Sequence, residues 1–498
     1  MDRSNTTDRQ ILRSTFIMGG SSIINSLLGV VRTKVIALML GPSGMGLTGI
    51  YITITNLMTT LCGMGIGESG VRHIAGTLGA GDPDSISRTA RTVRHVSIIS
   101  GLGGFCLLLC LSYQLSRLTF GNTTRSLDVA ILSITIFFGA ASAGQTALIQ
   151  GMRRIADLAK VSILGALLGT VLSIPAIYLL GERGIAFYLV IVSGMSFLAS
   201  WWYSSKIELP AVIGTWRRSL FEAKPLLKLG LALMSGSLMS VGTQYLLRVL
   251  IVRYLGLTSA GAYHSSTTLS LVYVGIILNA MLTDFYPRLS ASAVDYGYCN
   301  SLINKQVEIG LLLSVPGILA IMTFAPFVIV LFYSSKFMLA VNILRWQILG
   351  VLLQVVSWPI GFMLRAQGNG KAFFLTELFS NLTQLVLAWL GIVHFGLAGV
   401  GMAFFVGNLF YLILIYLIVR CNYGFAFTRQ NVGIIVIFGM ATLMVFSTPF
   451  LVGKLISLTI GFGITVVIGM FSLWSLIEDA DTGMLPGLFI KIKTRVGF

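Results

Sequence analysis

The chain has 498 residues, of which 55% are hydrophobic and only 10% are charged, and its mean hydropathy is +0.89. Because soluble domains carry roughly 25% charged residues, this composition excludes an ordinary soluble protein. The formal net charge of +17 does not indicate nucleic-acid binding, since the basic residues are scattered over short segments between apolar runs. The five cysteines have no ligand spacing, so we expect neither disulfides nor a metal site.

The apolar runs are long enough to cross a membrane, and the first begins close to the N-terminus. Residues 11–40 exceed the length of a signal-peptide core and lack a cleavage site of small residues. A spanning helix needs about 20 apolar residues. Runs of that length predict about fourteen helices, centred near residues 26, 55, 105, 140, 168, 193, 242, 272, 320, 353, 383, 408, 441 and 465.

The first predicted helix carries cations at membrane depth. Arg32 is in line with Ser22, Asn25 and Gly29 at spacings of three or four residues, which places them on one helical face. Because a charge near the bilayer centre costs at least ~2.5 to 3.5 kcal/mol, Arg32 is a functional candidate. The alternative is snorkelling to the outer headgroups, and for Lys34, which lies nearer the surface, we favour that interpretation.

Two acidic residues close the second and eighth predicted helices at the expected cytoplasmic end. Glu68 is followed four residues later by Arg72, and Asp284 is followed by Arg288 at the same spacing. Such pairs are usually solvated helix ends worth ~0.3 to 0.5 kcal/mol. The alternative is a cytoplasmic gate whose ion pairs form when the cavity opens outward.

The loop after the second predicted helix has the pattern of a basic amphipathic helix. Asp82 and Pro83 form a helix start, and Arg88, Arg91 and His95 share one face of the segment that follows. We expect this face to contact anionic lipid headgroups.

An internal repeat with an offset of about 216 residues divides the chain. The two copies have the same orientation, because an even number of helices separates them, and their axis lies along the membrane normal. We predict an N-terminal lobe at 1–220, a C-terminal lobe at 221–425, and two further helices with a basic cytoplasmic tail at 426–498. The recurring residues are Met18, Gly20, Ser21 and Arg32 with Met234, Gly236, Ser237 and Arg248; Leu40, Gly41 and Gly46 with Leu255, Gly256 and Gly261; Gln150 and Gly151 with Gln367 and Gly368; and Gly184 with Gly399.

The seventh predicted helix repeats the polar face of the first. Arg248 aligns with Ser237, Ser240 and Gln244 at spacings of three or four residues. A vestibule lined by arginines from both lobes would suit an anionic headgroup, since arginine binds phosphate oxygens bidentately. The candidate substrate ligands are therefore Arg32, Arg248, Lys34, Arg345, Asn25, Gln244 and Ser240.

Two later residues leave alternatives open. Arg345, beside Asn342, either lines a cavity of the second lobe or belongs to an interfacial helix around residues 336–346. Glu377, two turns into the eleventh predicted helix, is either a group that couples transport to protons or cations, or a hydrogen-bonded core acid. The gate or coupling candidates are Glu68, Arg72, Asp284, Arg288 and Glu377.

Basic residues alternate in density from one predicted loop to the next, as the positive-inside rule requires. With a cytoplasmic N-terminus, the cytoplasmic segments hold most of the 34 basic residues. The opposite loops hold only Arg117, Arg125, Arg183, Arg253, Lys336 and Lys454. We therefore expect a multi-pass membrane protein with both termini in the cytoplasm.

Motifs for catalysis are missing from the sequence. The two Gly-Lys pairs, at residues 370–371 and 453–454, lack the upstream glycine of a nucleotide-binding P-loop. The four histidines lie far apart, and the chain has no H-E-x-x-H or G-x-S-x-G motif. We expect a transporter and not an enzyme.

Two stretches flanking the second predicted helix carry a family resemblance. A G-P-x-G-x-G-L turn occupies residues 41–47, and G-x-G-E-x-G-V-R-H-I-A occupies residues 65–75. With the tandem six-helix lobes, these motifs resemble the Wzx-type O-antigen and polysaccharide flippases of the multidrug/oligosaccharidyl-lipid/polysaccharide (MOP) exporter superfamily. Helices thirteen and fourteen exceed the twelve-helix core, as in longer family members.

The resemblance implies an all-α, MATE-like fold and a role in polysaccharide or lipopolysaccharide biosynthesis. The implied activity is translocation of undecaprenyl-pyrophosphate-linked oligosaccharide across the bacterial inner membrane by alternating access, with Arg32 and Arg248 as pyrophosphate ligands. The implied partners are this lipid-linked substrate, membrane lipids, and polysaccharide polymerase and chain-length machinery. No cofactor is implied, and coupling to a proton or sodium gradient is left open.

Two rival functions follow from other interpretations of the same features. A multidrug or cation antiporter of the same fold would favour carboxylates in the lobes, where this chain has arginines. A membrane glycan polymerase or ligase would resemble chains with a large outer loop, which this sequence lacks.

Overall fold

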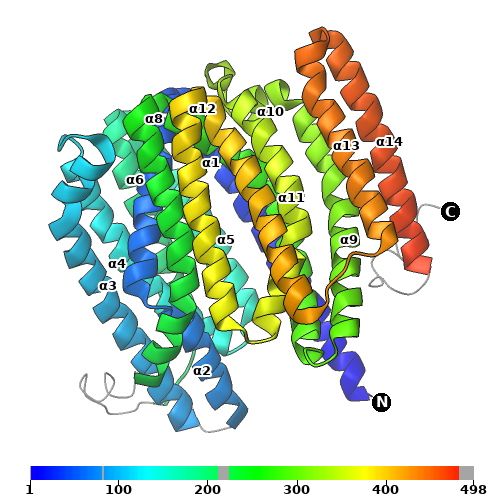
Figure 1. The fold of residues 1–498 in the computed structure, drawn as a ribbon. Helices are drawn as coiled ribbons and strands as arrows, with labels where there is room; N and C mark the ends of the chain where they lie inside the picture. The colour runs from blue at the N-terminus through cyan, green and yellow to red at the C-terminus, as the bar shows by residue number, and fades with distance from the viewer. Residues whose placement is uncertain (1, 81–82, 211–223, 482–498) are drawn as a thin grey trace. The chain divides into compact units, whose positions relative to one another are not determined.

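The computed structural model describes residues 2–80, 83–210 and 224–481, and all of its described elements are helical (Figure 1). The predicted helix start at Asp82 and the basic C-terminal tail lie outside the described residues. The helices are α1 (Asp2–Gly63), α2 (Ile66–Ala80), α3 (Pro83–Phe120), α4 (Ser126–Gly151), α5 (Ile155–Leu180), α6 (Gly184–Ser205), α8 (Lys224–Ala291), α9 (Tyr296–Thr323), α10 (Ala325–Phe332), α11 (Ala340–Ala366), α12 (Gly370–Tyr423), α13 (Arg429–Leu451) and α14 (Lys454–Asp481), with 3-10 turns η1 (Gly181–Arg183) and η2 (Ser335–Phe337).

Ten helical stretches of the described chain are long and apolar enough to cross a membrane. Four of them are too long for one crossing and contain a break: α1 at Gly41, α8 at Gly256, α12 at Gly396, and the α5–α6 stretch at η1. Each part exceeds the roughly 20 residues that a crossing needs, so the stretches provide fourteen spans. The predicted number of spanning helices and the all-α fold are confirmed.

The breaks show which helix ends were predicted wrongly from the sequence. The expected turn at residues 41–47 is helical except at Gly41, because Pro42 is tolerated at the first position of the second half. Glu68 lies in the first turn of α2 and does not close the preceding helix, which ends at Gly63. A carboxylate there is favoured by the partial positive charge of a helix N-terminus.

Three other boundaries also differ from expectation. The basic segment around Arg91 is not a separate loop helix, because α3 runs unbroken from Pro83 into the membrane span. The ninth span is centred about ten residues earlier than predicted, since a break at Phe324 separates α9 from the short apolar α10. Arg345 lies inside the spanning helix α11, so the interfacial helix considered at residues 336–346 is wrong.

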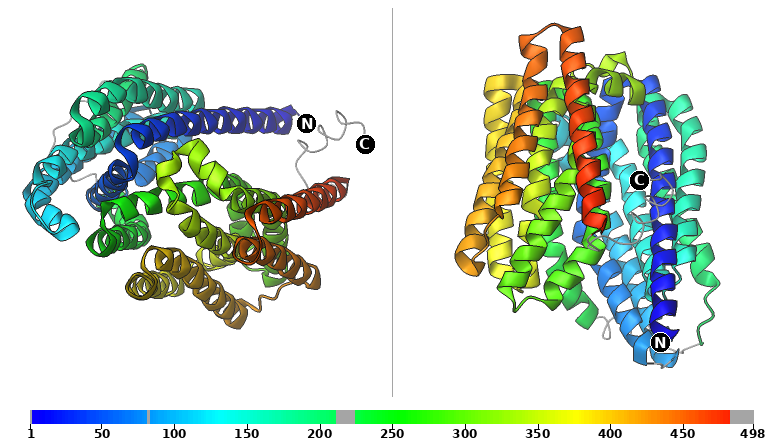
Figure 2. Two further views of the ribbon diagram at one scale, coloured as in Figure 1. Left: turned by 90° about the horizontal axis from the view of Figure 1, so that it is seen from above. Right: turned by 90° about the vertical axis from the view of Figure 1, so that its right-hand side faces the viewer.

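Two compact units make up the described structure. Unit 1 comprises Met1–Gly261 and unit 2 comprises Ala262–Phe498, so the kinked helix α8 contributes to both. In unit 1, α4 packs against α3 and α6, α5 packs against α6, and α1 packs along α5. In unit 2, α11 packs against α12, and α9 contacts α11, α13 and α14, the last two running side by side (Figures 1 and 2). The lobe boundaries near residues 220 and 425 stay a prediction.

Three pairs of positive-φ residues recur at a constant offset of 215 residues. Positive-φ residues occur at Gly41 and Gly256, at Gly181 and Gly396, and at Arg153 and Gly368. The last pair corrects the sequence alignment, which matched Gln150 with Gln367. By helix ends, Gln367 corresponds to Met152, since both are the C-cap of a spanning helix. Backbone conformation therefore supports the tandem repeat more sharply than the few identities did.

The helical segments that follow the breaks at Gly41 and Gly256 pack against each other within unit 1. A Cβ on Gly46 would lie 2.2 Å from the carbonyl oxygen of Leu257, and a Cβ on Gly261 would lie 1.8 Å from that of Pro42. These two contacts are equivalent under the 215-residue offset. Only glycine fits at these two positions, because the backbones of α1 and α8 nearly touch there.

Candidate substrate-binding site

The polar face of α1 is held by α5 and α6. The guanidinium carbon of Arg32 lies 5.3 Å from the ring centroid of Tyr188, a buried residue of α6. Asn25 donates a hydrogen bond from Nδ2 to the hydroxyl of Ser162 on α5 at 2.6 Å, whereas its buried Oδ1 has no partner among the described residues. Arg32 therefore contacts the protein through a cation–π interaction worth about 0.5 to 2 kcal/mol. Lys34, further along α1, is half-buried.

The first half of α8 presents the matching face. Ser237, Ser240 and Gln244 are exposed, and Arg248 is half-buried. Lipid tails offer no hydrogen-bond partners, so a row of exposed polar side chains in a spanning helix normally faces water or a ligand. The structure thus gives both repeats a polar face that ends in an arginine, as the sequence predicted, while their role as ligands stays a prediction.

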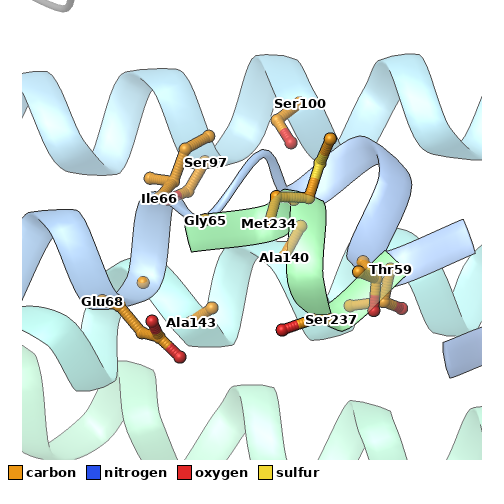
Figure 3. Close-up of a pocket in the computed structure, with 13 residues that line it drawn as sticks. Thr59, Gly65, Ile66, Glu68, Ser97, Ser100, Ala140, Ala143, Met234 and Ser237 are labelled. Atoms are coloured by element: carbon orange, nitrogen blue, oxygen red, sulfur yellow. The ribbon is translucent and has the colours of Figure 1, made fainter. Parts of the chain in front are cut away.

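A cavity of about 230 Å³ lies in unit 1 beside this face of α8 (Figure 3). Its wall comes from the end of α1, from α2, α3 and α4, and from Met234 and Ser237 of α8. Glu68 is the one charged residue among those that line it, and its carboxylate is exposed. The structure therefore brings Glu68 together with the polar face of α8.

Hydroxyl groups supply most of the remaining polar surface of the cavity. Thr59, Thr60, Ser97 and Ser100 line it together with Ser237. Ser100 donates to the backbone oxygen of Cys62, whereas the buried Oγ of Ser97 has no hydrogen-bond partner among the described residues. Thr59, Thr60, Ser97 and Ser100 were not predicted from the sequence, because serine and threonine are common in spanning helices and carry no signal of their own.

The proposed gate pairs differ from each other. Arg288 donates to Asp284 from Nε at 3.0 Å, and both side chains are more than half exposed, which fits a solvated helix end. Glu68 and Arg72 are both exposed and make no ion pair with each other in the described structure. The two predicted pairs are therefore not equivalent in this conformation, and a gating role stays a prediction.

Two further candidates lie in unit 2. Arg345 of α11 is half-buried, and its Nε is buried without a hydrogen-bond partner among the described residues. Glu377 of α12 is half-buried and accepts a long hydrogen bond from the Tyr411 hydroxyl at 3.5 Å. Arg365 stacks on the rings of Phe362 and Phe373, at 4.8 and 4.4 Å from their centroids. Glu377 thus has a protein partner and retains free acceptor capacity.

A charge network in unit 1 was also not predicted, because the sequence indicated only that Arg125 is a basic residue of a loop. The hydroxyl of Tyr51 donates to Oδ2 of buried Asp128 at 2.9 Å, and Arg125 donates to the same oxygen at 3.4 Å. Arg125 also pairs with Glu182, which accepts from Ser43 at 3.4 Å. Partial burial acts to lower the pKa of Arg125, but the hydrogen bonds and charges of its acidic partners outweigh burial and raise that pKa.

Comparisons with known proteins agree with this architecture. A family model described as polysaccharide biosynthesis protein matches residues 35–342. The chain is 23% identical over 416 residues to a lipid III flippase of Escherichia coli K12, covering 79% of this chain and 94% of the relative. It is similar in fold to the lipid II flippase MurJ in an inward closed conformation, with a TM-score of 0.68 and 15% identity, covering 92% of this chain and 98% of that one. An inward-facing multidrug resistance MATE family transporter of the MOP superfamily gives a TM-score of 0.64 at 19% identity, covering 80% and 94% of the two chains.

Proposed function

The chain belongs to the polysaccharide biosynthesis protein family, and from this premise we propose that it is a flippase for a lipid-linked oligosaccharide. The substrate would be an undecaprenyl-pyrophosphate carrying a polysaccharide repeat unit, such as an O-antigen unit. It would move from the cytoplasmic to the outer leaflet of a bacterial inner membrane by alternating access. The curated relatives that support this proposal are named as lipid III flippases.

The observation that carries the proposal is the pair of arginines on repeat-related helices. Arg32 and Arg248 each end a row of small polar residues on a spanning helix. Guanidinium groups bind phosphate oxygens bidentately, and two of them match the charge of a pyrophosphate. A carrier of cationic drugs would need carboxylates at these positions, so the charge sign favours an anionic headgroup.

The proposed group that couples transport to a proton or cation gradient is Glu377. Its carboxylate is half-buried in a spanning helix and accepts one long hydrogen bond, so protonation or cation binding there would change the local charge. Polysaccharide polymerase and chain-length machinery are the proposed protein partners, because each exported unit must be consumed on the outer side.

The test replaces each arginine by alanine in the native host after deletion of the chromosomal copy. Arg32→Ala and Arg248→Ala should each reduce surface polysaccharide at least about tenfold, since each removes a charge-assisted phosphate contact. Arg183→Ala, an exposed arginine of η1, is the matched control and should export normally. Membrane insertion is checked by immunoblotting of the membrane fraction.

Two outcomes would contradict the proposal. Normal surface polysaccharide in an Arg32→Ala/Arg248→Ala double variant would show that these arginines do not form a headgroup site. The second outcome is that expression of the protein makes a susceptible host resistant to cationic drugs, while loss of the protein leaves glycan export unchanged. This result would show a drug exporter and not a flippase.

A further inference from the structure

Arg32 is held within unit 1 in a way that leaves its hydrogen-bond donors free. Its guanidinium carbon lies 5.3 Å from the ring centroid of Tyr188, and its side chain makes no hydrogen bond or ion pair with the residues that the structure describes. A ring face attracts the cation without using its N–H groups. The donors of the guanidinium therefore stay available to a ligand.

Three other arginines of unit 1 are bound through these donors to protein oxygens. They are Arg125, which pairs with Glu182, Arg154, which pairs with Asp157 at 2.7 Å, and Arg253, which donates to two backbone oxygens at the end of α3. A guanidinium binds phosphate and carboxylate oxygens with the same N–H groups, so these three side chains already use donors that a phosphate would need. Arg32 differs from them because its protein partner is a ring and not an oxygen.

Tyr188 is a fixed support for this arginine. It is 3% exposed and lies near the start of α6, which begins at Gly184. Its hydroxyl makes no hydrogen bond within the described part of the chain, so the ring face is the part of Tyr188 that contacts a polar group. A buried ring cannot follow a guanidinium that moves toward lipid headgroups. The contact therefore defines one position for the Arg32 side chain.

A second contact fixes the direction of the polar face of α1. Asn25, about two turns before Arg32, donates from Nδ2 to the hydroxyl of Ser162 on α5. The helices that supply the two contacts are neighbours, since α5 packs against α6 and α1 packs along α5. Arg32 is half-buried, so part of its side chain stays accessible. The face is therefore held in place before a ligand binds, which reduces the entropy lost on binding.

An aromatic partner also keeps the positive charge of Arg32 available to an anion. A carboxylate in the place of the ring would neutralise the guanidinium and compete with a phosphate for the same donors. The ring attracts the cation through its quadrupole and carries no net charge. A lysine at position 32 would not be equivalent, because an ammonium group lacks the planar fork that stacks on a ring and binds two oxygens at once.

We propose that Tyr188 is a positioning residue, which holds the Arg32 guanidinium in place with its N–H donors free for a pyrophosphate. This inference rests on the proposed flippase function and adds a residue that acts through Arg32. The effect of Tyr188 on affinity is that of one cation–π contact, which corresponds to about threefold to thirtyfold.

The test measures the affinity of the purified full-length protein for farnesyl pyrophosphate by isothermal titration. Tyr188→Leu should weaken binding about threefold to thirtyfold, whereas Tyr188→Phe, which keeps the ring, should bind within about twofold of the wild type. In an Arg32→Ala background, Tyr188→Leu should have almost no further effect, because no guanidinium is left to position. If Tyr188→Leu does not fold, Tyr188→Met takes its place, since the flexible methionine side chain fills irregular space.

The matched control is Tyr203→Leu, because Tyr203 also lies on α6 and its ring centroid is 4.9 Å from a cation, the Nζ of Lys206. This variant should bind farnesyl pyrophosphate normally. The positioning role would be overturned by normal binding of Tyr188→Leu, by weakening in Tyr188→Phe as large as in Tyr188→Leu, or by equal effects of Tyr188→Leu with and without Arg32. Normal binding by Arg32→Ala would contradict the headgroup site of the proposed function itself.

Discussion

Asp128 shows how one buried charge can organise the end of a helical unit. Its side chain is 8% exposed and accepts from Tyr51 of α1 and from Arg125 just before α4. Arg125 then pairs with Glu182 of η1, so one network joins three segments of unit 1. A buried acid is tolerated here because a cation and a hydroxyl both satisfy it.

Removing this carboxylate should destabilise the protein without touching the proposed binding face. We expect Asp128→Ala to lower the free energy of unfolding by about 2 to 4 kcal/mol, because Tyr51 loses its acceptor and Arg125 loses one of its two acidic partners. Asp128→Asn should cost less, since an amide oxygen still accepts from Tyr51. Thermal unfolding of the purified protein measures both, and equal melting temperatures for wild type and Asp128→Ala would contradict a structural role.

Individual functional residues were the hardest features to predict from the sequence. Arg32 and Arg248 could be found because charge is rare in a spanning helix, and rarity itself is a signal. Ser97 could not, since its place in the cavity wall and its missing hydrogen bond arise only when the helices pack. The helix-start position of Glu68 depended on the break at residues 64–65, where positive φ ends α1 early.

At the scale of elements, α13 is docked onto α9 by a buried polar network. Asn431, 1% exposed, donates from Nδ2 to the backbone oxygen of Asn304 at 2.7 Å and to its side chain at 2.9 Å. Asn304 also accepts from the backbone nitrogen of Thr428 and donates to the oxygen of Ala426, which fixes the approach to α13. Gln430 adds a hydrogen bond to buried Glu308 at 2.9 Å. The segment between α12 and α13 is therefore held to α9 by side-chain amides.

Loss of Asn304 should release this docking. Asn304→Ala removes the partner of the Thr428 nitrogen and of the Ala426 oxygen and one of the two hydrogen bonds of Asn431, so we expect local opening of residues 424–431 to become at least about tenfold more frequent. Hydrogen exchange of these amides measures the change, with Asn422→Ala, an exposed asparagine at the end of α12, as the matched control. Unchanged exchange in Asn304→Ala would show that apolar contacts alone hold α13 in place.

At the scale of the whole molecule, the topology is still a prediction from charge. Fourteen spans place both termini on one side of the membrane, and the density of basic residues assigns that side to the cytoplasm. A fluorescent protein that folds only in the cytoplasm should be active when fused at the C-terminus. Alkaline phosphatase, which is active only outside the cytoplasm, should be inactive at the same position and active when inserted at Gly453 between α13 and α14. The reverse pattern would contradict the orientation.

The sequence by itself determined the number of spans, the tandem repeat and the arginine on each repeat-related helix. These features are local or periodic: apolar length, the spacing of identities, and charge where charge is costly. Tertiary structure decided what those patterns could not. It placed the breaks of α1, α8 and α12 at single positive-φ glycines, brought Gly46 against Leu257, and placed Glu68 and Ser97 in the wall of one cavity. Such contacts depend on which helices meet, and the distances between residues remote in sequence are set only when the helices pack.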